Sequence, residues 1–404
     1  MLLVRILLPF SMAARSNDTV KVGDRDNRNP QQEPIVEAPS EHVGAWLRLS
    51  MISGVGPRIL SQLIEHFGDP ESILAAKENA LREISGVGSK LVQAIARADE
   101  IDIESELATC REHQINILTV DDKAYPRMLR EIPDPPGVLF VQGELLPADA
   151  LSVAVVGSRN ATRYGLTQAE RLATSLAHTG VTVVGGLARG IDSAAHRGAL
   201  AGGGRTVAVL AGGILKMYPP EHQDLSQEIA QQGAVVSEMP PNYSPIRGSF
   251  PQRNRIISGL ALGTIVVEAG ERSGALITAR QSMEQNRDVF AVPGPVDSLA
   301  SRGCHALLRD GAILVESLED VLEQLGPLVE TAEQDDGRRI RHPTELQLKD
   351  QEIAVLQAIE MRPTDIDQVI RETGLPAQRV LSTISVLEVR KLIVRCPGGA
   401  VARR

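Results

Sequence analysis

Residues 153–159 read VAVVGSR and residues 181–192 read VTVVGGLARGID, so an apolar run twice ends in glycine and arginine. Such runs alternate with helical stretches across the centre of the chain, and the strand candidates are residues 153–156, 181–184, 206–210, 234–237, 264–267 and 289–292. Continuous apolar strands separated by helices predict a mostly parallel sheet covered on both faces, a Rossmann-like, doubly wound α/β domain. Ligands of such sheets bind beyond the carboxyl ends of the strands.

The ends of three predicted strands carry groups that suit an anion. Gly157 lets the backbone approach a phosphate, Ser158 adds a hydroxyl donor, and the guanidinium of Arg159 matches phosphate oxygens in pairs. The other residues of this kind are Gly186, Arg189 and Ser273. The GxGxxG fingerprint and the GxxxxGK[ST] loop are missing at the first strand end, so hydride transfer and nucleotide hydrolysis are not the first expectations.

The run PIRGSFPQRNRIISGL at residues 245–260 carries three arginines and an aromatic residue just before an apolar helix. Its candidate ligand-binding residues are Arg247, Phe250, Arg253, Asn254 and Arg255. Arginines beside a Phe suit backbone phosphates with a base stacked on the ring. The last two arginines could instead pair with carboxylates such as Glu238 and Glu268 and fix the loop. Both interpretations can hold together, with one arginine binding ligand while its neighbour holds the architecture.

The central domain shows no Ser-His-Asp set, no metal-ligand spacing and no convincing pair of carboxylates. Asp192 stands where it can cap the helix that follows it. His196, one turn later, could act as a general base, but a packed role inside the helix is the stronger interpretation. We therefore predict a site that binds its ligand, with no catalytic residue, no metal and no cofactor.

The pentapeptide ISGVG occurs at residues 52–56 and again at 84–88, each time before an amphipathic helix. Two helices joined by a Gly-x-Gly turn form a helix-hairpin-helix, whose backbone N–H groups can point at a DNA phosphate. The glycines could equally serve only a tight turn, and the sequence favours neither alternative. We expect this helical domain at residues 42–110, after a disordered leader at residues 1–41 in which Met12 is a plausible initiator.

A polar, charged stretch separates the central domain, expected at residues 111–328, from a compact last unit. Residues 329–347 are predicted to form a linker. Residues 348–404 are predicted to form a winged helix, with a turn at 374–376 between two helices and a β-hairpin at the end. This unit could contact DNA, but its helix at 378–389 carries few basic groups, so a role in protein interaction or packing is favoured.

Bulk composition limits the class of protein. The formal net charge of −9 argues against a broad nucleic-acid surface, so any DNA site must be a local cluster of arginines. Cys110, Cys304 and Cys396 show no zinc-ligand spacing, and we expect reduced thiols in a cytoplasmic protein. After the first residues, no run approaches the roughly 20 apolar residues of a membrane span.

Ordered motifs between residues 157 and 294 resemble those of the DNA-processing protein A family, also called DprA or Smf. They are GSR (157–159), GGLARGID (185–192), YPPEH (218–222), SEMP (237–240), FPQRNRIISGL (250–260), VVEAG (266–270), SGALITA (273–279) and FAVPG (290–294). The resemblance, which covers residues 46–404, implies a bacterial cytoplasmic protein that binds single-stranded DNA and catalyses no reaction. It implies that the protein helps to load RecA recombinase onto this DNA during natural transformation, and that it forms a homodimer through the Rossmann-like domain.

The DNA pocket of that family can be carried onto this sequence motif by motif. It falls on Gly157, Ser158, Arg159, Gly186, Arg189, Arg247, Phe250, Arg253 and Asn254. Two residues depart from the family pattern: Lys216 replaces an acidic residue before the Tyr, and His222 replaces Asn after Tyr-Pro-x-Glu. Because Lys216 could add a phosphate contact, these departures affect the expected rim of the pocket.

Two other functions stay open at this point. A related Rossmann-like family of N-glycosidases cleaves nucleoside monophosphates, and Glu268 could supply its carboxylate, although the PGGxGT loop of those enzymes is missing. A transcription regulator would instead use the winged helix to bind a specific duplex sequence.

Overall fold

The computed structural model describes residues 41–326, 332–333 and 339–404. Residues 1–40 of the predicted leader, with the alternative initiator Met12, and residues 329–331 and 334–338 of the predicted linker lie outside these residues. In the described part, the central element is one sheet with the strand order β1-β2-β6-β5-β4-β3-β7-β8-β9. The strands are β1 (Ile115–Thr119), β2 (Val138–Gly143), β3 (Ser152–Val156), β4 (Thr182–Gly185), β5 (Thr206–Leu210), β6 (Ala234–Ser237), β7 (Gly263–Val266), β8 (Asp288–Ala291) and β9 (Ile313–Leu314).

The sheet confirms the predicted α/β class. All pairings from β6 to β9 are parallel, whereas β1 and β2 extend one edge in antiparallel pairing. The chain builds β3 to β6 in one direction and then returns to place β7 on the other side of β3. The strand order therefore reverses between β3 and β7, and a reversal of this kind opens a crevice at the carboxyl ends of the strands.

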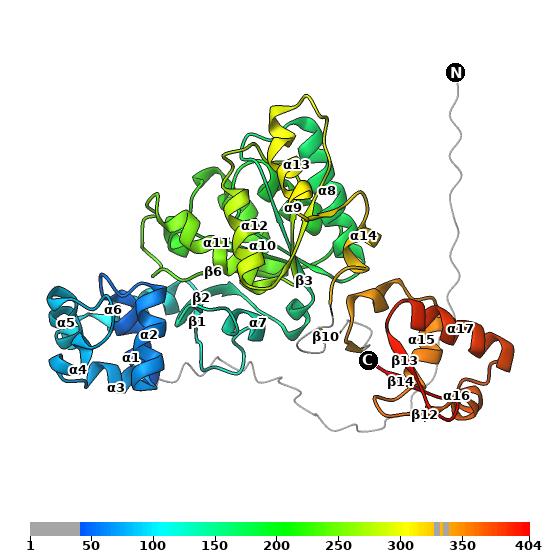
Figure 1. Ribbon diagram of the computed structural model, residues 1–404. Helices are drawn as coiled ribbons and strands as arrows, with labels where there is room; N and C mark the ends of the chain where they lie inside the picture. The colour runs from blue at the N-terminus through cyan, green and yellow to red at the C-terminus, as the bar shows by residue number, and fades with distance from the viewer. Residues whose placement is uncertain (1–40, 327–331, 334–338) are drawn as a thin grey trace, which may run out of the picture. The chain divides into compact units, whose positions relative to one another are not determined.

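Helices cover both faces of this sheet (Figure 1). Side chains of β3 alternate between the faces, so Val153 and Val155 pack with helices α8 and α9, while Ala154 and Val156 pack with α11 and α12. The elements of this domain are α7 (Arg127–Arg130), η2 (Pro147–Ala150), α8 (Arg163–His178), α9 (Ile191–Ala201), η3 (Ile214–Lys216), η4 (Pro220–His222), α10 (Gln223–Gln232), α11 (Ser249–Leu260), α12 (Ala275–Glu284), η5 (Leu299–Ser301), α13 (Arg302–Arg309) and α14 (Leu318–Leu322).

The ISGVG repeat folds the same way twice in the N-terminal helical domain. Gly54 and Gly86 have φ values of +99° and +88°, which only glycine adopts readily, and Gly56 and Gly88 then cap the next helices with nearly equal dihedral angles. The helices are α1 (Glu41–Met51), α2 (Pro57–Phe67), α3 (Pro70–Leu74), α4 (Glu78–Arg82), α5 (Ser89–Ala96), η1 (Ala98–Glu100) and α6 (Ile103–Glu112).

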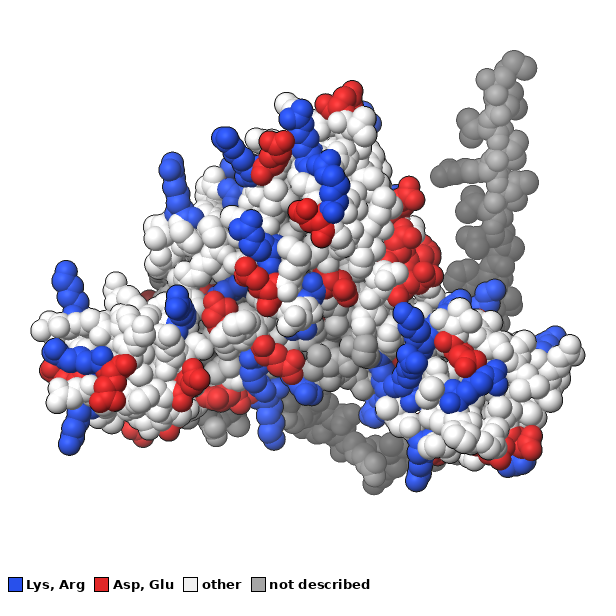
Figure 2. Space-filling view, in the orientation of Figure 1, with Lys and Arg blue, Asp and Glu red and all other residues white. Residues whose placement is uncertain are grey.

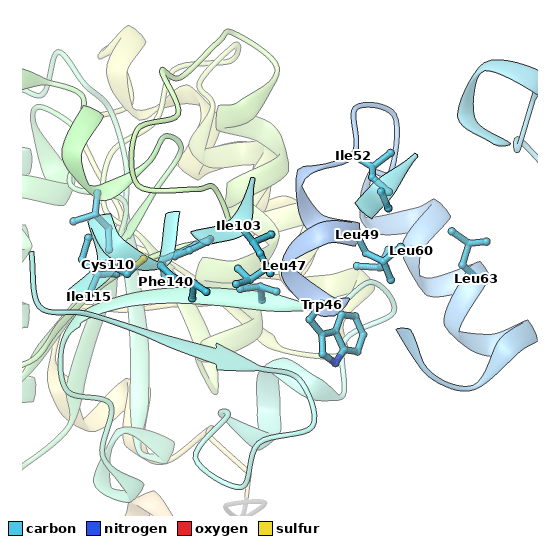
Figure 3. Close-up of a cluster of buried hydrophobic side chains, with 14 of the residues drawn as sticks. Trp46, Leu47, Leu49, Ile52, Leu60, Leu63, Ile103, Cys110, Ile115 and Phe140 are labelled. Atoms are coloured by element: carbon cyan, nitrogen blue, oxygen red, sulfur yellow. The ribbon is translucent and has the colours of Figure 1, made fainter. Parts of the chain in front are cut away.

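The helical domain and the edge of the sheet share one hydrophobic core (Figure 3). Trp46 and Leu47 of α1 lie in the same cluster as Ile115 of β1 and Phe140 of β2. The indole N–H of Trp46 donates to Oδ2 of Asp121 over 2.9 Å, so the polar end of this buried ring is satisfied. This continuous core fixes α2 beside the central domain.

The C-terminal unit is a winged helix, as predicted. Its three strands pair in the order β12-β14-β13, and Val355, Val369, Val380, Ile384 and Val401 form its core. The elements here are η6 (Pro343–Gln347), α15 (Asp350–Gln357), β12 (Thr364–Asp365), α16 (Ile366–Thr373), α17 (Ala377–Val389), β13 (Ile393–Cys396) and β14 (Ala400–Arg403), preceded by the strand pair β10 (Ala332–Glu333) and β11 (Arg339–Ile340). Across the described segments, no helix combines the length and the apolar character that crossing a membrane requires.

Gly137 offers a direct test of the shared core. A Cβ at this position would lie 2.5 Å from Cζ3 and 2.7 Å from Cε3 of Trp46. We expect Gly137→Ala to lower the free energy of unfolding by about 1–3 kcal/mol through overpacking, measured by denaturant titration. Gly326→Ala is the matched control, because a Cβ there meets no atom within 4 Å. Equal stability of both variants would contradict the packing described for Trp46.

Candidate nucleic-acid interface

A cavity of about 870 Å³ opens at the carboxyl ends of β3 and β7, where the strand order reverses. The loop after β3, the loop after β7 and the first turns of α11 and α12 line it. Four arginines reach its wall, namely Arg159, Arg247, Arg253 and Arg272, against the single carboxylate of Asp192. On the surface, basic side chains project over α12 and α13, and acidic ones gather over α14 (Figure 2). The local charge of the cavity is thus opposite to that of the whole chain.

The loop after β3 is hydrogen-bonded to the segment that follows β7. The backbone N–H of Ser158 donates to the carbonyl of Glu268 over 2.6 Å, and the Ser158 hydroxyl accepts from the N–H of Asn160 over 3.2 Å. A Cβ on Gly157 would lie 2.5 Å from Cγ1 of Ile191, so glycine is needed here for packing as well as for an open backbone. The loop presents Arg159 to solvent at the rim of the cavity.

Two arginines and two aromatic rings form a ladder on one side of the cavity. The guanidinium of Arg159 lies over the Phe250 ring at 4.9 Å, and Phe250 meets Tyr218 edge to face at 5.8 Å. Arg189 lies over Tyr218 at 5.5 Å and pairs with Glu221 at 2.5 Å. Each exposed cation–π contact contributes only about 0.5–1 kcal/mol, so a ligand ring can replace a guanidinium over Phe250 at small cost.

Arg253 forms the floor of the cavity and is only 5% exposed. Its Nη1 donates to the carbonyl of Val209, and its guanidinium occupies the space that a side chain at Gly186 would need. Burial lowers the pKa of Arg253 to about 10, with Asp192 acting in the opposite direction, so the group stays charged at neutral pH. Nε of Arg253 has no hydrogen-bond partner in the described structure.

The remaining wall comes from α11 and α12. Arg247 lines it from the loop before α11 and Asn254 from α11 itself. Ser273 lies two residues before α12, and its hydroxyl accepts from the N–H of Ala275 over 3.3 Å. Arg272 and Tyr218, which is 44% exposed, line the cavity but were not among the predicted binding residues. Arg272 directly precedes the SGALITA motif and Tyr218 opens the YPPEH motif, and these positions were the available signal.

Four predicted residues do not line the main cavity, namely Arg255, Lys216, Gly186 and Arg189. Arg255 is only 4% exposed, and its guanidinium lies between Glu238, 2.5 Å from Nη2, and Asp134, 3.2 Å from Nε. This arginine therefore holds the architecture, and its neighbour Arg253 faces the ligand site. Lys216 is exposed at the end of η3 but lies outside the cavity lining. Gly186 and Arg189 line a small pocket beside the main cavity, which they share with Tyr218 and Phe250.

Glu268 and His196, the side chains that a catalytic function would use, already form hydrogen bonds within the protein. Glu268 is buried, and its two carboxylate oxygens accept from the N–H and the hydroxyl of Thr162 over 2.9 Å and 2.5 Å. His196 is fully buried, bonds the Thr206 hydroxyl over 2.7 Å, and has its pKa lowered by burial to about 3. Neither side chain lines the cavity. The described residues contain no group of three His, Cys, Asp or Glu placed to hold a metal ion.

His222, the second departure from the expected pattern, supports the loop after β4. Its Nδ1 donates to the carbonyl of Leu187 over 2.9 Å, and Leu187 adopts the unusual φ of +53°. The imidazole thus anchors the backbone just before Arg189. His222 therefore supports the loop beneath the rim and does not line the cavity.

The parallel sheet and its cationic strand-end cavity define a Rossmann-like domain suited to a phosphate-bearing ligand. Residues 116–326 match the family model for DNA recombination-mediator protein A, residues 341–399 the DprA winged helix domain, and residues 47–98 the SAM-like helix-hairpin-helix tandem. The chain belongs to the DNA recombination-mediator protein A family, which confirms the resemblance in its motifs.

Individual relatives agree with this assignment. The chain is 35% identical to Protein Smf of Synechocystis sp. over 390 residues, covering 89% of this chain and 98% of that one. It is 40% identical to DNA processing protein DprA of Bacillus subtilis over 240 residues, 58% of this chain and 81% of the relative. The solved DNA processing protein A of Streptococcus pneumoniae is 36% identical, with a TM-score of 0.62 over 70% of this chain and 98% of that one.

The different environments of Arg255 and Arg247 make a stability prediction. Glu238→Ala leaves the buried Arg255 without its 2.5 Å partner, and we expect it to lower the free energy of unfolding by about 3 kcal/mol. Arg247→Ala, at an exposed rim position, should leave unfolding in urea nearly unchanged. If removing Glu238 costs no more than removing Arg247, Arg255 is not the structural arginine described here.

Proposed function

We propose that this protein binds single-stranded DNA in the strand-end cavity. The observation that carries the proposal is the set of four arginines around one cavity of an acidic chain, with only the buried Asp192 opposing them. Guanidinium groups bind phosphate oxygens through paired hydrogen bonds and displace the condensed counterions of DNA. Arg253 adds a guanidinium that is only 5% exposed in the wall of the cavity, where solvent screens its attraction for a phosphate less than at the surface.

The aromatic side chains favour a single strand over a duplex. Phe250 is half-buried within the cavity wall, between Arg159 and Tyr218, so only an unstacked base can reach its ring. Stacking of a base on an aromatic ring contributes about 1–3 kcal/mol and accepts every base. Duplex bases are already stacked and paired, so a duplex would present only its backbone to this cavity.

The proposed binding residues are those that the structure gathers at the cavity or its adjoining pocket. They are Gly157, Ser158, Arg159, Gly186, Arg189, Tyr218, Arg247, Phe250, Arg253, Asn254, Arg272 and Ser273. Lys216 remains a predicted contact at the outer rim. Arg255 is withdrawn from the set, because two carboxylates already hold it.

The wider role follows from the family. Relatives are named as DNA-processing proteins and the family as a recombination mediator. We infer that this protein helps to load RecA recombinase onto single-stranded DNA during natural transformation, in the cytoplasm and without catalysing a reaction. We also infer a homodimer formed through the Rossmann-like domain.

Exchange of the rim arginines tests DNA binding. Arg159→Ala and Arg247→Ala should each weaken binding of an oligo-dT by roughly tenfold and reduce the slope of log affinity against log salt by about 0.7. Fluorescence anisotropy at several salt concentrations measures both quantities. Arg309→Ala is the matched control, because Arg309 is exposed at the end of α13 and outside the cavity lining. Wild-type affinity in both rim variants would refute the proposed site.

A further inference from the structure

A second polar cavity, of about 430 Å³, lies between α2 of the helical domain and the helices α11 and α12. We call it the glutamine groove, because Gln62, Gln281 and Gln285 line it. Its position is fixed by the shared core of the two domains and by a hydrogen bond from the Ser61 hydroxyl to the carbonyl of Pro133, 3.3 Å long. The groove belongs to no part of the site described above.

Buried polar atoms without partners collect at this groove. The Oε1 atoms of Gln62, Gln281 and Gln285 are shielded from solvent and accept no hydrogen bond within the described structure, and Nη1 of Arg255 donates none. The amide nitrogens of two glutamines are engaged, since Gln281 donates to the carbonyl of Pro251 and Gln285 to that of Arg255. The carbonyl oxygens are therefore the groups that still need partners. Such unpaired atoms are costly, and a ligand with matching groups would satisfy them.

The charges of the groove do not suit phosphate. Arg58 and Arg255 are balanced there by Asp134 and Glu284. A neutral groove rich in amide oxygens instead suits the edges of nucleobases. Three acceptor oxygens are among the unpaired buried atoms of the groove, and they match a base that carries an exocyclic amine, such as cytosine or adenine. Thymine presents carbonyl oxygens at the corresponding edge, so its acceptor oxygens would face the acceptor oxygens of the glutamines.

One face of α12 connects the groove with the cavity. Ile277 lines the cavity, and Gln281 and Gln285 line the groove at positions four and eight residues later, which lie on the same side of a helix. Ile277 and Gln285 are therefore separated by only about 12 Å along the helix axis. Pro251 joins the two sites as well, because it lines the cavity while its carbonyl accepts from Gln281. A strand that leaves the cavity along α12 reaches the groove directly.

We propose that the glutamine groove is a second binding site for the same DNA strand, and that this groove binds amine-bearing bases in preference to thymine. The inference rests on the proposed function of the main cavity. It also gives the helical domain a part in DNA binding, through Gln62 and through Arg58 in the first turn of α2 after the first ISGVG hairpin.

The test compares oligo-dC with oligo-dT of the same length, about 20 nucleotides, on the full-length protein by anisotropy at slightly alkaline pH. These pyrimidines differ in this edge group, an amine in cytosine and an oxygen in thymine. We expect the wild-type protein to bind oligo-dC roughly tenfold more tightly. The variant Gln281→Leu/Gln285→Leu should reduce this ratio to near one while keeping the affinity for oligo-dT.

Two further variants keep the result interpretable. Gln62→Leu should also reduce the ratio, because it removes the acceptor supplied by α2. Met283→Leu, at an exposed position of α12 outside the groove, should leave the ratio unchanged. Three results would overturn the second binding site. They are equal affinities of the wild-type protein for the two oligonucleotides, a preference for oligo-dC that survives in both glutamine variants, or an equal loss of affinity for both oligonucleotides in these variants. Failure of the wild-type protein to bind either oligonucleotide would contradict the proposed function itself.

Discussion

The guanidinium of Arg253 keeps its charge with 5% of its surface exposed, and much of the central domain is arranged around that constraint. Removing a cation from water costs several kcal/mol unless other groups compensate it. Asp192 at the start of α9 supplies the opposite charge, and the carbonyl of Val209 at the end of β5 accepts a hydrogen bond. Gly186 after β4 leaves room for the group, while Asp192 accepts from its N–H over 3.0 Å. One buried cation thus ties α9, α11 and two strand ends together beneath the cavity.

The arginines of α11 and its approach show how one short segment supports both the fold and the site. Arg255 is neutralised by two carboxylates and joins α11 to the edge of the domain. Arg253 is charged, buried and only partly satisfied, so it can receive an anion from the cavity. Arg247 and Arg159 are exposed, which suits the capture of a strand from solution. The proposed function needs all three environments.

The sequence was sufficient for the six strands β3 to β8, because long apolar runs in a parallel sheet are buried on both faces, but the edge strands β1, β2 and β9 were not among the predicted strands of the sheet. The ISGVG repeat likewise predicted both hairpins. The site was only partly predictable. The run at 245–260 was expected to precede a helix, but α11 begins at Ser249, so Arg253 and Arg255 stand two residues apart on a helix and point about 200° from each other. The expected pairing with Glu238 is confirmed for Arg255, whereas Glu268 instead accepts from Thr162. Asp192, which lies opposite Arg253, and Asp134, which pairs with Arg255, come from other segments, and these contacts are a property of the folded chain. The same applies to Arg272 and Tyr218.

Photo-crosslinking tests the central claim most directly. A bromodeoxyuridine-substituted single strand is irradiated in complex with the full-length protein, and the linked peptides are identified by mass spectrometry. The account predicts links at Phe250 and Tyr218, whose rings lie 5.8 Å apart beside the cavity, and their loss when unlabelled single strand competes. Links confined to the winged helix, with none in the segments around Tyr218 and Phe250, would contradict the assignment of the strand-end cavity as the DNA site.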